Sequence, residues 1–202
     1  MRVTPREIAL FPLQGVLFPG ALLQLKVFEA RYLDLVGRCL RENTSFGVVC
    51  LRQGREVGRD SVRFEREGAL ARIDEVDAEQ PGILRVRCSG GQRFAIDGVP
   101  RQQSDGLWLA DISLLGDDDA QAPDAALLPS VKALANAIAA LREQGSTPFT
   151  PPYRFDDAGW VANRWCEILP IPLEAKQRLM MLTEPQLRLK LVDEYLRGKG
   201  VV

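Results

Sequence analysis

The chain has 202 residues, of which 46% are hydrophobic and 26% are charged. This is the composition of a folded globular protein rather than of a disordered, collagen-like or disulfide-stapled one. The 26 basic and 27 acidic residues leave a net charge of −1, which argues against a nucleic-acid binder that depends on a strong basic field. Histidine is absent, which excludes Ser-His-Asp and Cys-His catalysis and histidine-ligated zinc and leans away from an enzyme.

The first long apolar stretch is Ile8–Leu25, which contains no charged residue. It has the apolar character of a signal peptide or a membrane span, but Pro12 and Pro19 would break a helix there. We therefore expect two buried strands joined by turns, no membrane association and a cytoplasmic protein. The four cysteines form no Cys-x-x-Cys pair and are expected to be free, buried thiols of a reducing compartment.

Short apolar or alternating runs continue to about residue 115 and are separated by turn signals, which favours a closed or nearly closed β-barrel. The expected strands are Glu7–Phe11, Leu22–Phe28, Ser45–Leu51, Ala69–Val76, Ile83–Cys88, Arg93–Gly98 and Leu107–Leu115. The turn signals are Pro19-Gly20, Pro81-Gly82, Gly90-Gly91 and Asp105-Gly106.

One helix interrupts these strands. Apolar residues from Tyr32 to Leu40 follow the spacing of a helix that lies against a barrel. Glu29 is expected to open this helix, because negative charge is favourable at a helix N-terminus, and Asn43 is expected to end it.

The pattern changes after residue 115. Residues 116–123 are acidic and polar and end in proline, as in a linker. Beyond them the apolar period becomes helical, and Thr183-Glu184-Pro185-Gln186 resembles a capping box before a last helix lined by Leu187, Leu191, Val192 and Tyr195. The sequence thus predicts an α+β protein with a β domain over 1–115, an acidic linker over 116–123 and a small helical bundle over 124–202.

No motif for catalysis, phosphate binding or metal binding stands out. The chain has neither a P-loop nor a Gly-x-Gly-x-x-Gly motif, and its carboxylate clusters lie in charged, turn-like contexts. We expect no catalytic residue, no cofactor and no metal. The basic region 52–66 interleaves Arg52, Arg55, Arg59, Arg63 and Arg66 with acidic residues, which favours a salt-bridged surface loop over a nucleic-acid patch.

Three N-terminal motifs resemble those of the N-terminal domain of Lon proteases, and of stand-alone bacterial proteins that carry only this domain. They are Ile8-Ala9-Leu10-Phe11-Pro12-Leu13, Val16-Leu17-Phe18-Pro19-Gly20 and Leu25-Lys26-Val27-Phe28-Glu29-Ala30-Arg31-Tyr32. Weaker matches follow at Phe46-Gly47-Val48-Val49, Gly68, Arg93-Phe94, Leu169-Pro170-Ile171-Pro172, Lys176-Gln177 and Arg188-Leu189. Gln24 stands where the family usually has proline.

This resemblance implies a PUA-like β-barrel with one packed helix, followed by helices, a fold that serves protein-substrate recognition in Lon. It does not imply proteolysis, because the 202 residues hold neither an ATPase module nor a Ser-Lys protease domain. The residues of the family motifs are expected to be structural rather than ligand contacts. They are Phe11, Pro12, Phe18, Pro19, Gly20, Phe28, Glu29, Arg31, Tyr32, Arg93 and Phe94. Glu29, Arg31 and Arg93 are expected to form a charge network that pins the helix to the barrel.

The segment 145–156 is rich in proline and aromatic residues and departs from the family pattern. Its candidate protein-binding residues are Phe149, Tyr153 and Phe155. They either fold back over Trp160 and Trp165 or face outward as a sticky patch, and folding back is favoured because exposed aromatics invite aggregation.

The function expected from the sequence is a non-catalytic protein-binding module that binds proteins or unfolded polypeptide segments. Its expected role is that of an adaptor in protein quality control or proteolysis. Two alternatives stay open at this point. The first is a PUA-like RNA-binding module, against which the net charge counts. The second is a small-molecule-binding or hydrolytic protein, which needs a deep pocket with convergent polar groups. The sequence sets neither the partner nor the oligomeric state.

Overall fold

The computed structural model describes residues 6–54, 56 and 62–202. The chain divides into two compact units, Met1–Gly116 and Asp117–Val202, and each is described by itself.

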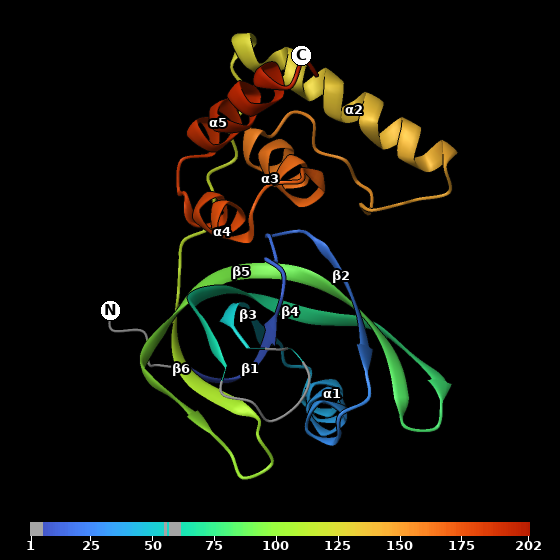
Figure 1. The fold of residues 1–202 in the computed structure, drawn as a ribbon, viewed down its shortest axis with the longest axis vertical. Coiled ribbons are helices and arrows are strands. Elements are labelled where there is room, and N and C mark those ends of the chain that lie inside the picture. Colours follow the sequence, from blue (N-terminus) through green and yellow to red (C-terminus); the bar gives the residue numbers. More distant parts are fainter. Residues whose placement is uncertain (1–5, 55, 57–61) are drawn as a thin grey trace. The chain divides into compact units, whose positions relative to one another are not determined.

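The first unit is a ring of strands with one helix (Figure 1). Its strands are β1 Arg6–Leu13, β2 Leu22–Val27, β3 Phe46–Gln53, β4 Arg63–Gln80, β5 Ile83–Gln102 and β6 Trp108–Leu114, and its helix is α1 Ala30–Glu42. The strand order is β2-β5-β4-β3-β1-β6, and a further pairing of β5 with β6 closes the ring. All of these pairs are antiparallel except β1 with β3. The mixed α+β fold predicted from the sequence is confirmed.

The expected turn at Gly90-Gly91 is wrong, because both glycines lie inside β5, a strand of 20 residues. The backbone N–H of Gly90 donates to the carbonyl of Ala21, and the Gly90 carbonyl accepts from the N–H of Gly20, both at 2.8 Å. A Cβ at Gly90 would lie 2.2 Å from the carbonyl oxygen of Phe18. Glycine therefore marks a close backbone approach here and not a reversal of the chain.

The interior of the ring is filled by alternate residues of its strands. The buried cluster consists of Ile8, Leu10, Val49, Phe94, Ile96, Ala110 and Ile112. On the outer side of β1, Phe11 stacks on Tyr32 of α1 with ring centroids 3.9 Å apart. Burial raises the pKa of Tyr32 to about 12, so its hydroxyl stays protonated at neutral pH.

Helix α1 begins and ends where the sequence predicts. Its buried face includes Tyr32, Leu35 and Val36. Asn43 adopts a left-handed conformation (φ 51°), and its N–H donates to the Cys39 carbonyl, as is common for the residue that ends a helix.

The second unit contains the 3₁₀ turn η1 Ala125–Leu127 and helices α2 Leu128–Glu143, α3 Ala158–Ile168, α4 Leu173–Met181 and α5 Pro185–Gly198 (Figure 1). Helix α3 is the core element, because most of its residues from Ala158 to Cys166 are buried. Its N-cap is Asp157, whose Oδ1 accepts hydrogen bonds from the backbone N–H groups of Gly159 (2.9 Å) and Trp160 (3.3 Å).

Helix α5 presents a different face from the one expected. Leu187 and Leu191 are 45% and 40% exposed, whereas Arg188 is 1% exposed. The Arg188 guanidinium binds Asp118 at 2.6 Å, so a charged side chain shares the buried face with Val192 of the expected stripe. The expected capping box is also wrong, since the N-cap is Glu184 and no side chain caps the helix.

The acidic segment 116–123 is expected to be a solvated linker, but two of its residues join the helical unit. Asp118 is the partner of Arg188, and the backbone carbonyl of Gln121 accepts a hydrogen bond from the N–H of Ala158 at 2.8 Å. These contacts place residues from 117 onward with the helices, in agreement with the division at Gly116 and Asp117.

Among the described residues, one helical segment, Ala125–Glu143, is long and apolar enough to cross a membrane by length and composition alone. Core helices of water-soluble proteins pass the same test. In this unit Leu134 and Ile138 of that segment are buried, and the Ser130 hydroxyl donates to Asp193 of α5 at 2.7 Å. The segment therefore has packing partners within the helical unit.

Candidate functional site

The aromatic residues of segment 145–156 fold back onto the helical unit. Phe149 is 4% exposed, as in the folded-back arrangement that the sequence favours. Tyr153 and Phe155 are half-buried and lie with their ring centroids 6.0 Å and 5.5 Å from that of Trp160. These rings fold back against Trp160 of α3 and stay partly exposed.

Most aromatic residues of the family motifs are core residues, as expected. Phe11, Phe18, Tyr32 and Phe94 are all less than 9% exposed. Phe28 is the exception, because it is 48% exposed. Strand β2 ends at Val27, which is buried, so the next residue in the alternation points outward.

The prolines and glycine of these motifs shape the backbone. Gly20 has a φ of 74°, which glycine adopts without steric cost, and it follows Pro19 in a turn closed by the N–H of Ala21 and the Phe18 carbonyl. Pro12 lies opposite Val49 of β3, beyond the β1 residues that pair with β6. Its missing N–H therefore removes no bond to β6.

The predicted charge network is present in part. Arg31 is buried, pairs with Glu29 at 2.9 Å and donates to the carbonyl of Gly106 at 3.0 Å. This ties the start of α1 to the loop between β5 and β6. Arg93 is buried as well and donates to the carbonyl of Gly116, which ties the chain that follows β6 to β5.

Region 52–66 is only partly a loop. Arg52 lies in β3 and Glu65 in β4, and the two side chains form an ion pair at 3.3 Å. This ion pair joins two neighbouring strands. Arg55 and Arg59 lie outside the described residues.

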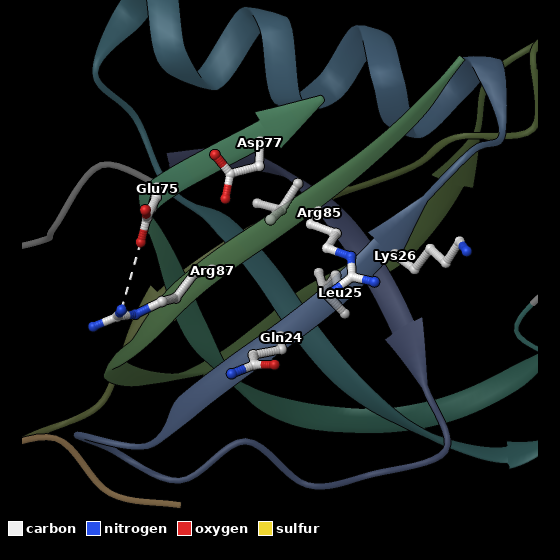
Figure 2. A pocket seen from close by; sticks show the side chains of 8 residues that line it. Gln24, Leu25, Lys26, Glu75, Asp77, Arg85 and Arg87 are labelled. Carbon is white, nitrogen blue, oxygen red and sulfur yellow. Dashed lines mark hydrogen bonds and ion pairs between the residues drawn. The ribbon is translucent and has the colours of Figure 1, made fainter. Parts of the chain in front are cut away.

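A hollow of about 400 Å³ lies on the three-stranded arm made by β2, the first half of β5 and β4 (Figure 2). The register of the strands sets its chemistry, because cross-strand neighbours share a face of the sheet. Two rows of polar residues run across the arm, Gln24–Arg87–Glu75 and Lys26–Arg85–Asp77. Leu25 and Val86 complete the lining. We call these eight residues the arm hollow.

The arm hollow has three basic and two acidic side chains, and Glu79 of the same hairpin supplies a third acidic one at the surface. Arg87 pairs with Glu75 at 3.5 Å, the contact dashed in Figure 2. Glu79 of the same hairpin pairs with Arg85 at 3.1 Å and with Lys26 at 3.4 Å. Hydrogen bonding to Arg85 holds the pKa of Glu79 below its usual range and raises that of Arg85. Glu79 and Arg85 are therefore both ionised at neutral pH.

The opposite face of the arm is apolar and closes against the barrel. Val27, Val86 and Cys88 are at most 2% exposed. Burial raises the pKa of the Cys88 thiol to about 12, so it is not a thiolate nucleophile at neutral pH. Within residues 6–54, 56 and 62–202, no cluster of three or more metal-ligating side chains is found. The arm therefore offers recognition by charge and shape rather than covalent or metal chemistry.

Strand β2 is an edge of the sheet. It pairs with β5, and in the described part of the chain no strand pairs with its other side. An edge strand presents backbone N–H and C=O groups that an extended chain can bind. Sequence reasoning missed this site. The alternation of 69–76 and 83–88 indicated half-buried strands, but only the register shows that their charged positions form rows beside an open edge.

A model of the ATP-dependent protease La (LON) substrate-binding domain matches residues 7–198. The chain belongs to the Lon substrate-binding domain family. A search of curated proteins gives no match.

Two solved structures support the same assignment. The chain is similar to a Lon N-terminal domain protein from Xanthomonas campestris, with 28% identity, a TM-score of 0.77, and 94% of this chain and 98% of that chain covered. It shares the fold of the N-terminal domain of Lon protease from Mycobacterium avium complex, with 12% identity, a TM-score of 0.61, and 94% and 97% coverage.

The family match carries two consequences. A Lon substrate-binding domain implies binding of protein substrates in general. This domain accounts for nearly the whole sequence, and no protease or ATPase domain is found beside it in the 202 residues.

Proposed function

We propose that this Lon substrate-binding domain binds extended polypeptide segments at the open edge of β2, with their side chains over the arm hollow. The observation that carries the proposal is that an unpaired strand edge borders a surface of alternating charge. A chain that adds to β2 gains main-chain hydrogen bonds whatever its sequence, and its alternate side chains face the hollow.

The exposed ion pairs of the arm suit such a ligand. Side chains of Lys26, Arg85 and Arg87 are 57%, 69% and 45% exposed, and pairs of this kind contribute little to stability. Replacing the ion-pair partner of one of these side chains by a charged group of the ligand therefore loses little free energy. Because both signs are present, the arm accepts segments of mixed charge rather than a single charged motif.

The first test uses one extended peptide of alternating charge in three forms: unmodified, N-methylated at odd positions and N-methylated at even positions. In an added strand, only alternate N–H groups face the neighbouring strand. We expect one methylated form to lose binding by roughly tenfold or more and the other to bind like the unmodified peptide. Equal binding by both methylated forms would exclude strand addition, and fluorescence anisotropy measures all three affinities.

The second test reverses charge at the arm. An Arg85→Glu, Arg87→Glu variant is expected to weaken binding of the unmodified peptide by roughly tenfold while the melting temperature stays close to wild type. The matched control is Arg142→Glu, Arg178→Glu, two exposed arginines of the helical unit. If the control weakens binding as much as the arm variant, the arm is not the site.

We further propose that the protein acts in the cytoplasm as an adaptor in protein quality control, presenting unfolded segments without cleaving them. The family assignment and the recognition chemistry of the arm support this role. Incubation of the protein with casein and ATP is expected to release no peptide and no phosphate. Turnover that is lost on mutation of this chain would overturn the adaptor role.

A further inference from the structure

A second hollow, of about 500 Å³, lies at one end of the barrel, on different residues from the arm hollow. It is built from the end of β3, the start of β4, the second half of β5 and the start of β6. Its lining residues are Arg52, Gln53, Val62, Arg63, Phe64, Arg66, Ile96, Pro100 and Trp108. We call these residues the barrel-end hollow.

Two aromatic rings, those of Phe64 and Trp108, form the floor of the barrel-end hollow. Phe64 and Trp108 meet edge to face at 5.4 Å between ring centroids, and both pack against the interior core cluster. Trp108 is also fixed from two sides by strand pairing, opposite Leu10 of β1 and Gln102 of β5. The rings are therefore held in place before any ligand arrives, which lowers the entropy that binding must lose.

The charge of the lining has one sign. Arg66 is anchored, since its guanidinium donates to the carbonyls of Ile96 at 2.7 Å and Gly98 at 2.6 Å. Arg52 is exposed and pairs with the half-buried Glu65 at 3.3 Å. Among the described residues, Arg63 has no ion pair. No carboxylate is found among the described residues of the lining, in contrast to the mixed charges of the arm hollow.

We propose that the barrel-end hollow binds a nucleotide, with the base against Phe64 and Trp108 and the phosphate on Arg52 and Arg63. An arginine fork matches the oxygens of a phosphate, and aromatic rings stack on bases of any sequence. A hollow of about 500 Å³ is within the range of small-ligand sites. Arg66 is a positioning residue, because its hydrogen bonds to Ile96 and Gly98 hold the wall formed by β5.

The same chemistry recognises a free nucleotide and a nucleotide within a single strand. The net charge of the chain is −1, so a long phosphate backbone meets little general attraction. We therefore expect one nucleotide to carry the affinity, with only a small gain from its neighbours. This site is independent of the proposed function, since the two hollows share no residue.

The test follows the three indole N–H signals of Trp108, Trp160 and Trp165 by NMR, with Trp108 assigned from a Trp108→Phe variant. AMP, a five-residue oligoadenylate, inorganic phosphate and a poly-glutamate peptide are titrated separately. We expect AMP and the oligonucleotide to shift the Trp108 signal with affinities within about tenfold of each other and to leave Trp160 and Trp165 unmoved. Phosphate and poly-glutamate are expected to bind at least tenfold more weakly.

Variants separate the site from general charge. Arg52→Gln with Arg63→Gln is expected to weaken AMP binding by roughly tenfold or more, with an unchanged melting temperature. Arg85→Gln with Arg87→Gln, in the arm hollow, is the matched control and is expected to leave AMP binding unchanged. Poly-glutamate that binds as tightly as AMP, an oligonucleotide that binds more than a hundredfold tighter than AMP, or no shift of Trp108 with millimolar AMP would each overturn the proposal.

Discussion

Gly90 decides how closely the turn after β1 can approach the barrel wall. Its backbone is bonded to both Gly20 and Ala21, and the carbonyl oxygen of Phe18 occupies the place of a side chain. The neighbouring Gly91 differs, because a Cβ there would lie 3.4 Å from the carbonyl oxygen of Leu70, an ordinary contact distance. Of the two adjacent glycines, Gly90 therefore lacks room for a side chain and Gly91 has room for a methyl group.

Gly90→Ala is therefore expected to destabilise the first unit by about 1–3 kcal/mol, because the added methyl group forces two backbone segments apart. This corresponds to a fall of several degrees in melting temperature, measured by circular dichroism. Gly91→Ala is the matched control and is expected to change the melting temperature little. Equal effects of the two substitutions would mean that the approach at Gly90 is not tight in solution.

At the scale of single elements, the extent of β5 shows what local sequence does and does not reveal. The alternation at 83–88 and 93–98 indicated strands correctly, and the helical spacing from Tyr32 to Leu40 located α1. The glycine pair between the two runs indicated a turn, since the partner that requires glycine, the Phe18 carbonyl, lies about 70 residues away in sequence. The arm hollow was missed for the same reason. Its charged residues can be read from each strand separately, but their alignment depends on how β2, β5 and β4 pair.

Helix α5 illustrates the same limit through one side chain. Apolar periodicity favoured the face with Leu187 and Leu191, whereas the buried face contains Arg188. Arg188 also donates to the carbonyl of Leu179 at 2.8 Å and to the Oδ1 of Asn163 at 3.0 Å. Its partner Asp118 lies 70 positions earlier, and no helical period can reveal such a pair.

Arg188→Ala is expected to lower the free energy of unfolding of the helical unit by about 3–5 kcal/mol. The loss arises because Asp118 and two carbonyls at the C-terminal end of α4, those of Leu179 and Leu182, lose Arg188 as a donor. Urea denaturation followed by circular dichroism measures the change. Arg197→Ala on the same helix removes a half-exposed ion pair with Asp193 and is expected to leave the urea midpoint near that of wild type. A similar midpoint for both variants would show that the buried contacts of Arg188 do not stabilise the helical unit.

Over the whole molecule, the four cysteines report on folding in both units. Cys39, Cys50 and Cys88 lie in the first unit and Cys166 in the second, and all four are free and buried. Burial raises the pKa of each thiol, to about 12 for Cys88 and Cys166. Below pH 9 all four thiols are protonated and buried, and the folded state is more stable than at higher pH.

At pH 8 the native protein is expected to react with Ellman's reagent at least tenfold more slowly than the urea-unfolded chain, because modification requires opening of the fold. Between the ordinary thiol pKa of 9.0 and the native value of about 12 for Cys88 and Cys166, the unfolded chain loses protons that the folded chain keeps. Stability therefore falls as pH rises through this range. Rapid labelling of all four thiols at pH 8 in the absence of urea would contradict this account.

The closure of the ring also bears on how the protein is made. Strand β1 leaves the ribosome before the other strands of the ring, and its two partners in the sheet are Phe46–Gln53 and Trp108–Leu114. Until the chain has been synthesised beyond Leu114, one edge of β1 has no native partner, and its apolar residues Ile8 and Leu10 have no complete interior to enter. A nascent chain with this topology folds late and exposes an aggregation-prone strand while it grows. We therefore expect the nascent domain to need protection from aggregation until Leu114 has left the ribosome.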